Sequence, residues 1–166
     1  MTTRSAGPAS VFTDDDERTR FCNLLATTIR RSSWNCWAFC IMSTHYHLLV
    51  EVPDDALQPG MQRLNWGYAR WFNAQHGRSG HLFGERYYCT RVETDIHMLI
   101  LLRYLARNPV AAGLCERPAD WRWGSYRGCI GIDEGFPFVD PAPLRAYFGD
   151  TAKRSTALIR RFVGDD

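Results

Sequence analysis

The sequence predicts an α+β fold, in which helices pack on one face of an antiparallel sheet. The predicted elements follow in the order helix, strand, strand, helix, strand, helix, which favours this class. Only Ser43 and Thr44 separate the first two strands, and such a short connection joins antiparallel neighbours. With 166 residues, the chain is long enough to bury a sizeable core within one domain.

The first half of the chain contains a helix followed by a β-hairpin. Thr13 and Asp16 form a variant of the capping box, and apolar residues then recur at helical spacing, which predicts a helix over residues 14–31. Residues 34–42 are aromatic and apolar, and residues 45–52 are rich in leucine and β-branched residues. Both runs therefore predict strands, joined by a tight turn.

Two further helices and one further strand are expected after the hairpin. Apolar residues at every third or fourth position predict a helix over residues 57–75, which Gly77 ends. A strand is predicted over residues 83–92. Thr94 is then expected to cap a third helix, which Pro109 ends because the residue before a proline disfavours helical geometry.

We expect one main domain over residues 11–130, with residues 1–10 disordered and residues 131–166 forming a tail. The first ten residues are small and polar, which disfavours a packed structure. Within the domain, an aromatic loop at residues 121–126 is expected to pack on the sheet. The tail is expected to hold one or two helices between residues 141 and 163. Three tryptophans are expected in the core: Trp34, Trp66 and Trp71.

The distribution of charge indicates an anionic partner. The net charge is only +2, but residues 57–127 carry ten arginines against five acidic residues, and both flanks are slightly acidic. All but one of the twenty basic residues are arginine, which suits bidentate contact with phosphate and stacking on bases.

The six cysteines indicate reduced thiols rather than a disulfide framework. None forms a CxxC pair, and the chain shows neither a signal-peptide pattern nor an apolar run near 18 residues. We therefore expect a soluble, cytoplasmic protein. Cys36 and Cys40 would share one face of a strand, which leaves a zinc pair as an open alternative.

Two histidines stand at the head of the second predicted strand. Side chains alternate along a strand, so His45 and His47 are expected to point to one face and Tyr46 to the other. One divalent ion could bridge the two imidazoles, because histidine is the commonest metal ligand. The alternative is a strand whose polar end is simply hydrated.

The third predicted helix places a phenol beside an amide. Tyr104 and Asn108 are four residues apart and therefore lie on one helix face. Taken alone, Tyr104 could be an interior tyrosine, and Asn108 before Pro109 could be a helix C-cap.

An ordered set of motifs resembles the HUH superfamily of single-tyrosine transposases, and in particular the REP-associated tyrosine transposases. The set comprises MSTHYHLL (42–49), GRSGHLF (77–83), RYY (86–88), RYLARNPVAAGL (103–114) and WRWGSY (121–126). The resemblance implies a ferredoxin-like palm. Family members usually open with a strand that precedes the first helix and pairs beside the HxH strand. Here that first strand is expected to be missing, which would indicate a start that lies too late or a truncated, inactive copy.

The resemblance implies that Tyr104 is the nucleophile and that His45, His47 and Asn108 bind a divalent metal ion, Mg²⁺ or Mn²⁺. The implied substrate is single-stranded DNA folded into a hairpin, nicked and rejoined through a phosphotyrosine. Four arginines are expected to contact DNA: Arg78, Arg86, Arg103 and Arg107. Zinc stays open because imidazoles suit it better than magnesium. Relatives include both homodimers and proteins that act alone, and the sequence does not choose between them.

Two other functions remain open from the sequence. The first is a non-catalytic DNA-binding relic, which would follow from a missing first strand. The second is a zinc hydrolase that uses His45, His47 and Cys40, with water as the nucleophile.

Overall fold

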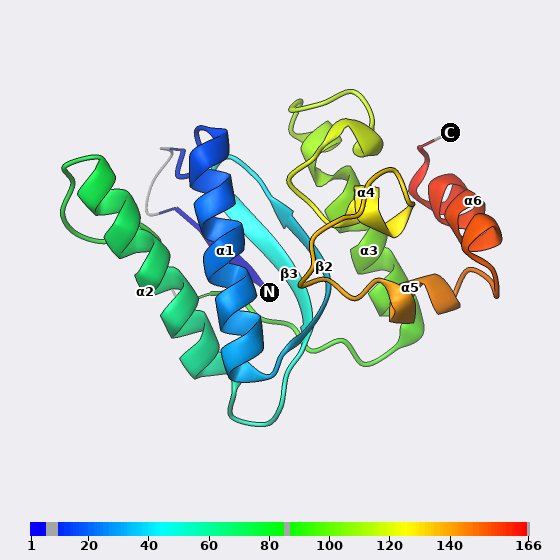
Figure 1. Cartoon of the computed structure of the whole chain (residues 1–166), viewed down its shortest axis with the longest axis horizontal. Coiled ribbons are helices and arrows are strands. Elements are labelled where there is room, and N and C mark those ends of the chain that lie inside the picture. The colour runs from blue at the N-terminus through cyan, green and yellow to red at the C-terminus, as the bar shows by residue number, and fades with distance from the viewer. Residues whose placement is uncertain (6–9, 85–86, 166) are drawn as a thin grey trace. The chain divides into compact units, whose positions relative to one another are not determined.

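The computed structural model describes residues 1–5, 10–84 and 87–165, which form two compact units. Unit 1 comprises Met1–Asn35 and Ile41–Cys89, and unit 2 comprises Cys36–Cys40 and Thr90–Asp166. Figure 1 shows the helices and strands of both units.

The predicted helices and hairpin of unit 1 are confirmed with small changes at their ends. Unit 1 contains β1 (Thr2–Arg4), α1 (Asp15–Ser32), β3 (His45–Glu51) and α2 (Leu57–Gln75). The ends of β2 (Asn35–Ile41) also belong to it. The strands form a sheet in the order β1-β3-β2, and β1 is antiparallel to β3. The α+β class is therefore confirmed.

The prediction of a missing first strand was wrong. Strand β1 pairs with β3, so that Thr2 lies opposite His47 and Thr3 lies opposite Tyr46. Two adjacent threonines favour a strand, but three residues are too few for alternation to be recognised in the sequence. The expectation of disorder over residues 1–10 is likewise not met at Thr2–Arg4, and β1 occupies the edge of β3 that we expected to be unpaired.

Helices α1 and α2 cover the face of β3 to which Tyr46 points. Tyr46 is fully buried, and its ring centroid lies 4.5 Å from that of Phe21 on α1. Its hydroxyl donates to Asn65 Oδ1 on α2 at 2.5 Å. Phe12 stacks on Tyr68 of α2 with a centroid distance of 5.0 Å. This aromatic cluster, completed by apolar residues of both helices, forms the core of unit 1.

The cap of α1 differs from the predicted one by one position. Asp14, not Thr13, is the N-cap, and its carboxylate accepts from the backbone N–H of Glu17 at 2.8 Å. The carboxylate of Glu17 in turn accepts from the backbone N–H and hydroxyl of Thr13. Thr13 therefore contributes to the start of the helix from outside it.

The predicted strand at residues 83–92 was wrong. Among its described residues, only Phe83 and Tyr88 make bridges, which are isolated and pair with Ser5 and Thr2. The β-branched and aromatic residues of this segment favour a strand. Gly84, the second residue of the predicted strand, disfavours it.

Unit 2 contains the third predicted helix and the helices of the tail. Its helical elements are α3 (Asp95–Ala111), the 3-10 turn η1 (Pro118–Asp120), α4 (Tyr126–Cys129), α5 (Ala142–Ala146) and α6 (Ala152–Val163). One or two helices were predicted in the tail, and the structure has two there, α5 and α6. Thr94 is the N-cap of α3, as predicted, and its hydroxyl accepts from His97 N at 3.2 Å.

The prediction that Pro109 ends the third helix was wrong. Pro109 lies inside α3, and the cap is Ala112, whose N–H donates to Asn108 O at 3.0 Å. Pro109 is buried, so its packing within unit 2 offsets the lost backbone hydrogen bond. Gly113, with φ of +69°, then turns the chain, since glycine adopts this conformation without strain.

The aromatic loop packs on β2, as predicted. Gly124 makes an antiparallel bridge with Cys40, and Ser125 exchanges hydrogen bonds with Phe39, from Ser125 N to Phe39 O at 3.0 Å and from Phe39 N to Ser125 Oγ at 3.0 Å. Trp123 and Tyr126 of this loop are buried.

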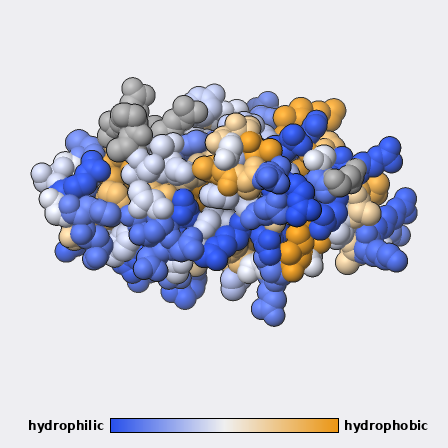
Figure 2. Space-filling model, turned by 90° about the horizontal axis from the view of Figure 1, so that it is seen from above, coloured by the Kyte–Doolittle hydropathy of each residue, from blue (hydrophilic) through white to orange (hydrophobic). Residues whose placement is uncertain are grey.

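No described helix is long and apolar enough to cross a membrane. Figure 2 shows one face of the molecule, on which hydrophilic residues separate several hydrophobic patches.

Replacing Gly60 with alanine should destabilise unit 1. An added Cβ would lie 2.1 Å from Cζ2 of Trp34, which is 3 % exposed and cannot move away freely. Overpacking of this kind costs about 1–3 kcal/mol, and the loss should be measurable by urea denaturation. Gly67→Ala on the same helix is the control, because its Cβ would approach only Leu24, at 3.6 Å. Alanine there should stabilise the helix by up to about 1 kcal/mol. Equal denaturation midpoints for the two variants would contradict this packing.

Candidate active site

The two histidines of β3 lie side by side in unit 1. The ring centroids of His45 and His47 are 4.8 Å apart, and the ring planes are nearly perpendicular, at 89°. Tyr46 between them is buried in the aromatic core beneath α1 and α2. The predicted alternation is therefore confirmed, and the imidazoles lie on the face of β3 opposite the one that these helices cover.

A threonine hydroxyl contacts Nδ1 of each imidazole. Thr2 Oγ1 of β1 is 2.7 Å from His47 Nδ1, and Thr44 Oγ1 is 3.0 Å from His45 Nδ1. These contacts orient both rings. Sequence reasoning missed both threonines, although the strand register that places Thr2 opposite His47 would have identified the first.

Tyr104 and Asn108 lie one turn apart on α3, in unit 2. Tyr104 is 48 % exposed, so the alternative that it is a buried, interior tyrosine is wrong. Asn108 is not the C-cap, because α3 continues to Ala111. The phenol and the amide are therefore presented by regular helix on one face, as the spacing predicts.

The four arginines expected to contact DNA occupy different environments. Arg78 is exposed on the loop after α2, and its guanidinium carbon lies 5.8 Å from the centroid of the Phe72 ring. Arg103 is exposed on α3. Arg107 donates to the carbonyl oxygens of Val163 at 3.0 Å and Gly164 at 3.2 Å. Arg86 lies outside the described residues.

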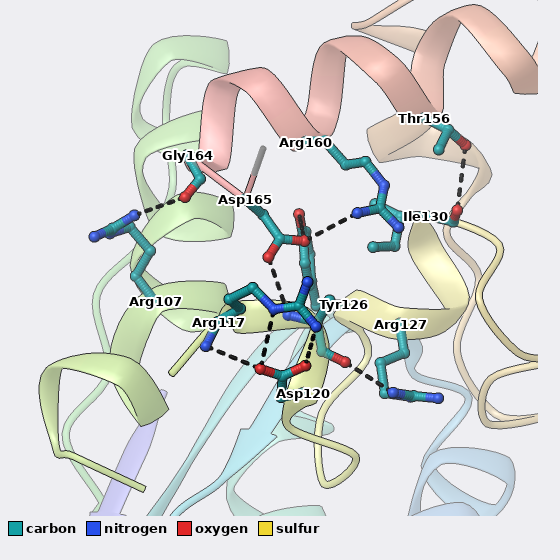
Figure 3. A network of polar contacts seen from close by, with 11 residues as sticks. Arg107, Arg117, Asp120, Tyr126, Arg127, Ile130, Thr156, Arg160, Gly164 and Asp165 are labelled. Carbon is teal, nitrogen blue, oxygen red and sulfur yellow. Dashed lines mark hydrogen bonds and ion pairs between the residues drawn. The ribbon is translucent and has the colours of Figure 1, made fainter. Parts of the chain in front are cut away.

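Arg107 belongs to a network that holds the end of α6 within unit 2 (Figure 3). Asp165 is 5 % exposed and accepts hydrogen bonds from Tyr126 Oη at 3.1 Å and from Arg160 at 3.4 Å. Burial, together with the nearby Asp165 charge, raises the pKa of Tyr126. The hydroxyl thus remains protonated and donates to the carboxylate. Arg107 therefore has a structural role at the end of α6.

The two cysteines that could have formed a zinc pair are both buried on β2. Cys36 is 1 % exposed and Cys40 is 2 % exposed. Burial raises the pKa of the Cys40 thiol, and zinc requires the thiolate. Within the described residues, no three side chains from histidine, cysteine, aspartate and glutamate form a group that could hold a metal. The burial of both thiols disfavours Cys36 and Cys40 as an exposed zinc pair.

Comparison with known proteins gives a family and a fold. The family model described as "Transposase IS200 like" matches residues 7–108. No curated protein matches the chain. Among solved structures, the chain is similar to the REP-associated tyrosine transposase that was solved bound to a REP hairpin, with a TM-score of 0.67 and 15% sequence identity. The similarity covers 82% of this chain and 80% of that one, and at this identity it shows a shared fold.

Proposed function

Because the family match spans more than half of its residues, the chain belongs to the IS200-like transposase family, and we propose that it nicks and rejoins single-stranded DNA through Tyr104. The substrate would carry a hairpin, since the structural relative is bound to one. The observation that carries the proposal is the pair of adjacent, threonine-oriented imidazoles on β3.

The family resemblance assigns a divalent ion to His45, His47 and Asn108, and the donor atoms of these side chains suit such an ion. Each imidazole has a hydroxyl at Nδ1, so Nε2 would be the ligating atom, with the Nδ1 proton donated to the threonine. The Asn108 amide oxygen would be the third ligand. When bound, Mg²⁺ or Mn²⁺ would neutralise and position the scissile phosphate. Zinc fits two imidazoles better, so the test includes all three metals.

Tyr104 supplies the nucleophile in this proposal. Its phenol oxygen attacks phosphorus while its proton passes to water, and the bond from phosphorus to the 3′ oxygen breaks. The 3′ oxygen takes up a proton, and the 5′ phosphate stays esterified to the tyrosine. A 3′-hydroxyl of another DNA end then attacks the phosphotyrosine and releases the phenol, so that the bond energy of the original linkage is conserved.

The exposed arginines are assigned to the DNA backbone. Arg78 and Arg103 are open to solvent, and arginine suits phosphate contact. Arg107 is assigned chiefly to its contacts with the end of α6.

The proposal is tested by incubating the protein with hairpin-bearing single-stranded DNA and Mn²⁺, Mg²⁺ or Zn²⁺. We expect a protein–DNA adduct that survives denaturant and carries the label of a 3′-end-labelled substrate, because the fragment 3′ of the nick stays esterified to the tyrosine through its 5′ phosphate. Salt-sensitive binding without any adduct would instead indicate a non-catalytic relic. The relic was suggested because the sequence was expected to lack a first strand. The structure contains that strand, since β1 pairs with β3.

Thr2→Val should weaken metal-dependent adduct formation without unfolding the protein. The variant removes the hydroxyl at His47 Nδ1 and retains a β-branched residue in β1. Loss of such a partner typically costs 10–100-fold in metal affinity or activity. The Mn²⁺ concentration for half-maximal adduct formation should rise accordingly. Thr27→Val is the control, because the hydroxyl of Thr27 donates within α1, to Asn23 O at 2.9 Å. Equal Mn²⁺ dependence in both variants would contradict the role of Thr2.

A further inference from the structure

One tryptophan of α2 is exposed, against the prediction that it lies in the core. Trp66 is 63 % exposed, whereas Trp34 is 3 % exposed and confirms the prediction. The core-facing side of α2 is formed by Leu64, Tyr68 and Phe72, and Trp66 points away from it. An exposed indole offers a flat aromatic face to a ligand, and its surroundings decide which ligand it suits.

An arginine stacks on the exposed indole. The guanidinium carbon of Arg70 lies 5.4 Å from the centroid of the Trp66 ring, one turn along α2. Arg63 is one turn earlier and also exposed, and it donates to Ser32 Oγ at 3.0 Å. The sequence Arg63-x-x-Trp66-x-x-x-Arg70 thus places a tryptophan between two cations on one helix face.

Helix α2 itself carries basic and no acidic side chains. Residues 56–84 contain no aspartate or glutamate, so no acidic side chain of α2 or the loop after it opposes the arginines. Helix α1 runs antiparallel beside α2, because Ser32 pairs with Arg63 and Glu17 pairs with His76. Arg30 and Arg31, both exposed, therefore come near the Arg63 end of α2.

We propose that Arg63, Trp66 and Arg70 form a binding surface for single-stranded DNA, here called the α2 surface. A single strand offers unpaired bases that stack on the indole and phosphates that pair with the guanidinium groups. An acidic peptide would satisfy the cations but has no comparable use for the tryptophan. The charge and the aromatic group together therefore favour a nucleic acid strand.

The α2 surface is separate from the histidine pair. Helix α2 covers the Tyr46 face of β3, whereas His45 and His47 lie on the opposite face. A strand on the α2 surface is thus a second contact, away from the histidines, that holds DNA flanking the cleaved region. The choice of DNA rests on the proposed function, but binding at this surface requires neither metal nor Tyr104.

The test is the affinity for fluorescent oligo-dT of roughly 20 nucleotides, longer than typical single-strand site sizes, measured by anisotropy in EDTA. Trp66→Ala should weaken binding about tenfold, and Trp66→Phe should retain most of it because a ring remains for stacking. Arg70→Gln should weaken binding and reduce the salt slope by about one. Controls are Tyr147→Ala, which removes an aromatic residue that is 46 % exposed, and Arg154→Gln, which removes an exposed arginine of α6.

Wild-type affinity in Trp66→Ala, or equal losses in the controls, would overturn the α2 surface. Displacement of oligo-dT by polyglutamate at equal charge would also overturn it, because charge alone would then explain binding. Self-association that depends on Trp66, detected by light scattering, would assign the surface to a second copy instead. The two proposals can fail separately. If the wild type forms no adduct but Trp66→Ala still weakens oligo-dT binding, the cleavage proposal is refuted and the α2 surface stands.

Discussion

Tyr104→Phe should abolish the covalent protein–DNA adduct while leaving DNA binding intact. The substitution removes only the hydroxyl that attacks phosphorus, and loss of a nucleophile lowers rates by several powers of ten, on the order of 10³-fold or more. Tyr104 is 48 % exposed, so its hydroxyl should contribute little to stability. Adduct formation is measured on denaturing gels with hairpin DNA and Mn²⁺, and binding by anisotropy.

Tyr147→Phe is the matched control for the nucleophile. Tyr147 belongs to the same unit, is 46 % exposed, and donates its hydroxyl to Asp95 at 2.9 Å. It should form the adduct at the wild-type rate. If Tyr104→Phe still forms a denaturant-resistant adduct at a comparable rate, another side chain is the nucleophile and the proposed role of Tyr104 is wrong.

Replacing either histidine of β3 should remove the dependence of adduct formation on the metal ion. A bound ion contributes several kcal/mol to stabilising charge at phosphorus, so His45→Ala and His47→Ala should each slow the reaction about a hundredfold or more. Binding of Mn²⁺, followed by titration calorimetry, should weaken in parallel. His47 is 4 % exposed, so its alanine variant is also checked for folding by circular dichroism.

His81→Ala is the control for the histidine pair. His81 lies in unit 1 and is exposed on the loop after α2. Its loss should change neither Mn²⁺ binding nor the adduct. Retention of full Mn²⁺ binding in a folded His45→Ala, His47→Ala double variant would place the ion elsewhere in the chain.

Long periodic segments allowed most of the fold to be predicted. The apolar spacing in α1 and α2 and the hairpin of β2 and β3 identified those elements within a residue or two of their bounds. The threonine cap of α3 was also correct. These signals are local, since each depends on residues within a few positions of one another.

The incorrect predictions concern elements that depend on distant partners. Strand β1 exists because its three residues have β3 as a neighbour, and three residues carry no recognisable period. Pro109 is accepted within α3 because it is buried there. Trp66 was assigned to the core from its residue type, whereas the helical phase of Leu64 and Tyr68 would have placed it outside.

The candidate site was predicted in part. Alternation along β3 correctly placed His45 and His47 on one face. The roles of the histidines, of Tyr104 and of Asn108 come from the family resemblance and stay proposals. The orienting threonine of β1 was missed, because it is brought to His47 only by pairing between strands that are distant in sequence.

The proline inside α3 has a mechanical consequence for the residues that it follows. Pro109 has no amide hydrogen, so the carbonyl of Leu105 receives no bond from the position four residues ahead. The missing hydrogen bond would lie in the same helical turn that joins Tyr104 to Asn108. With one backbone hydrogen bond fewer, this turn resists bending less than a fully bonded turn, and a small bend there would change the angle between phenol and amide.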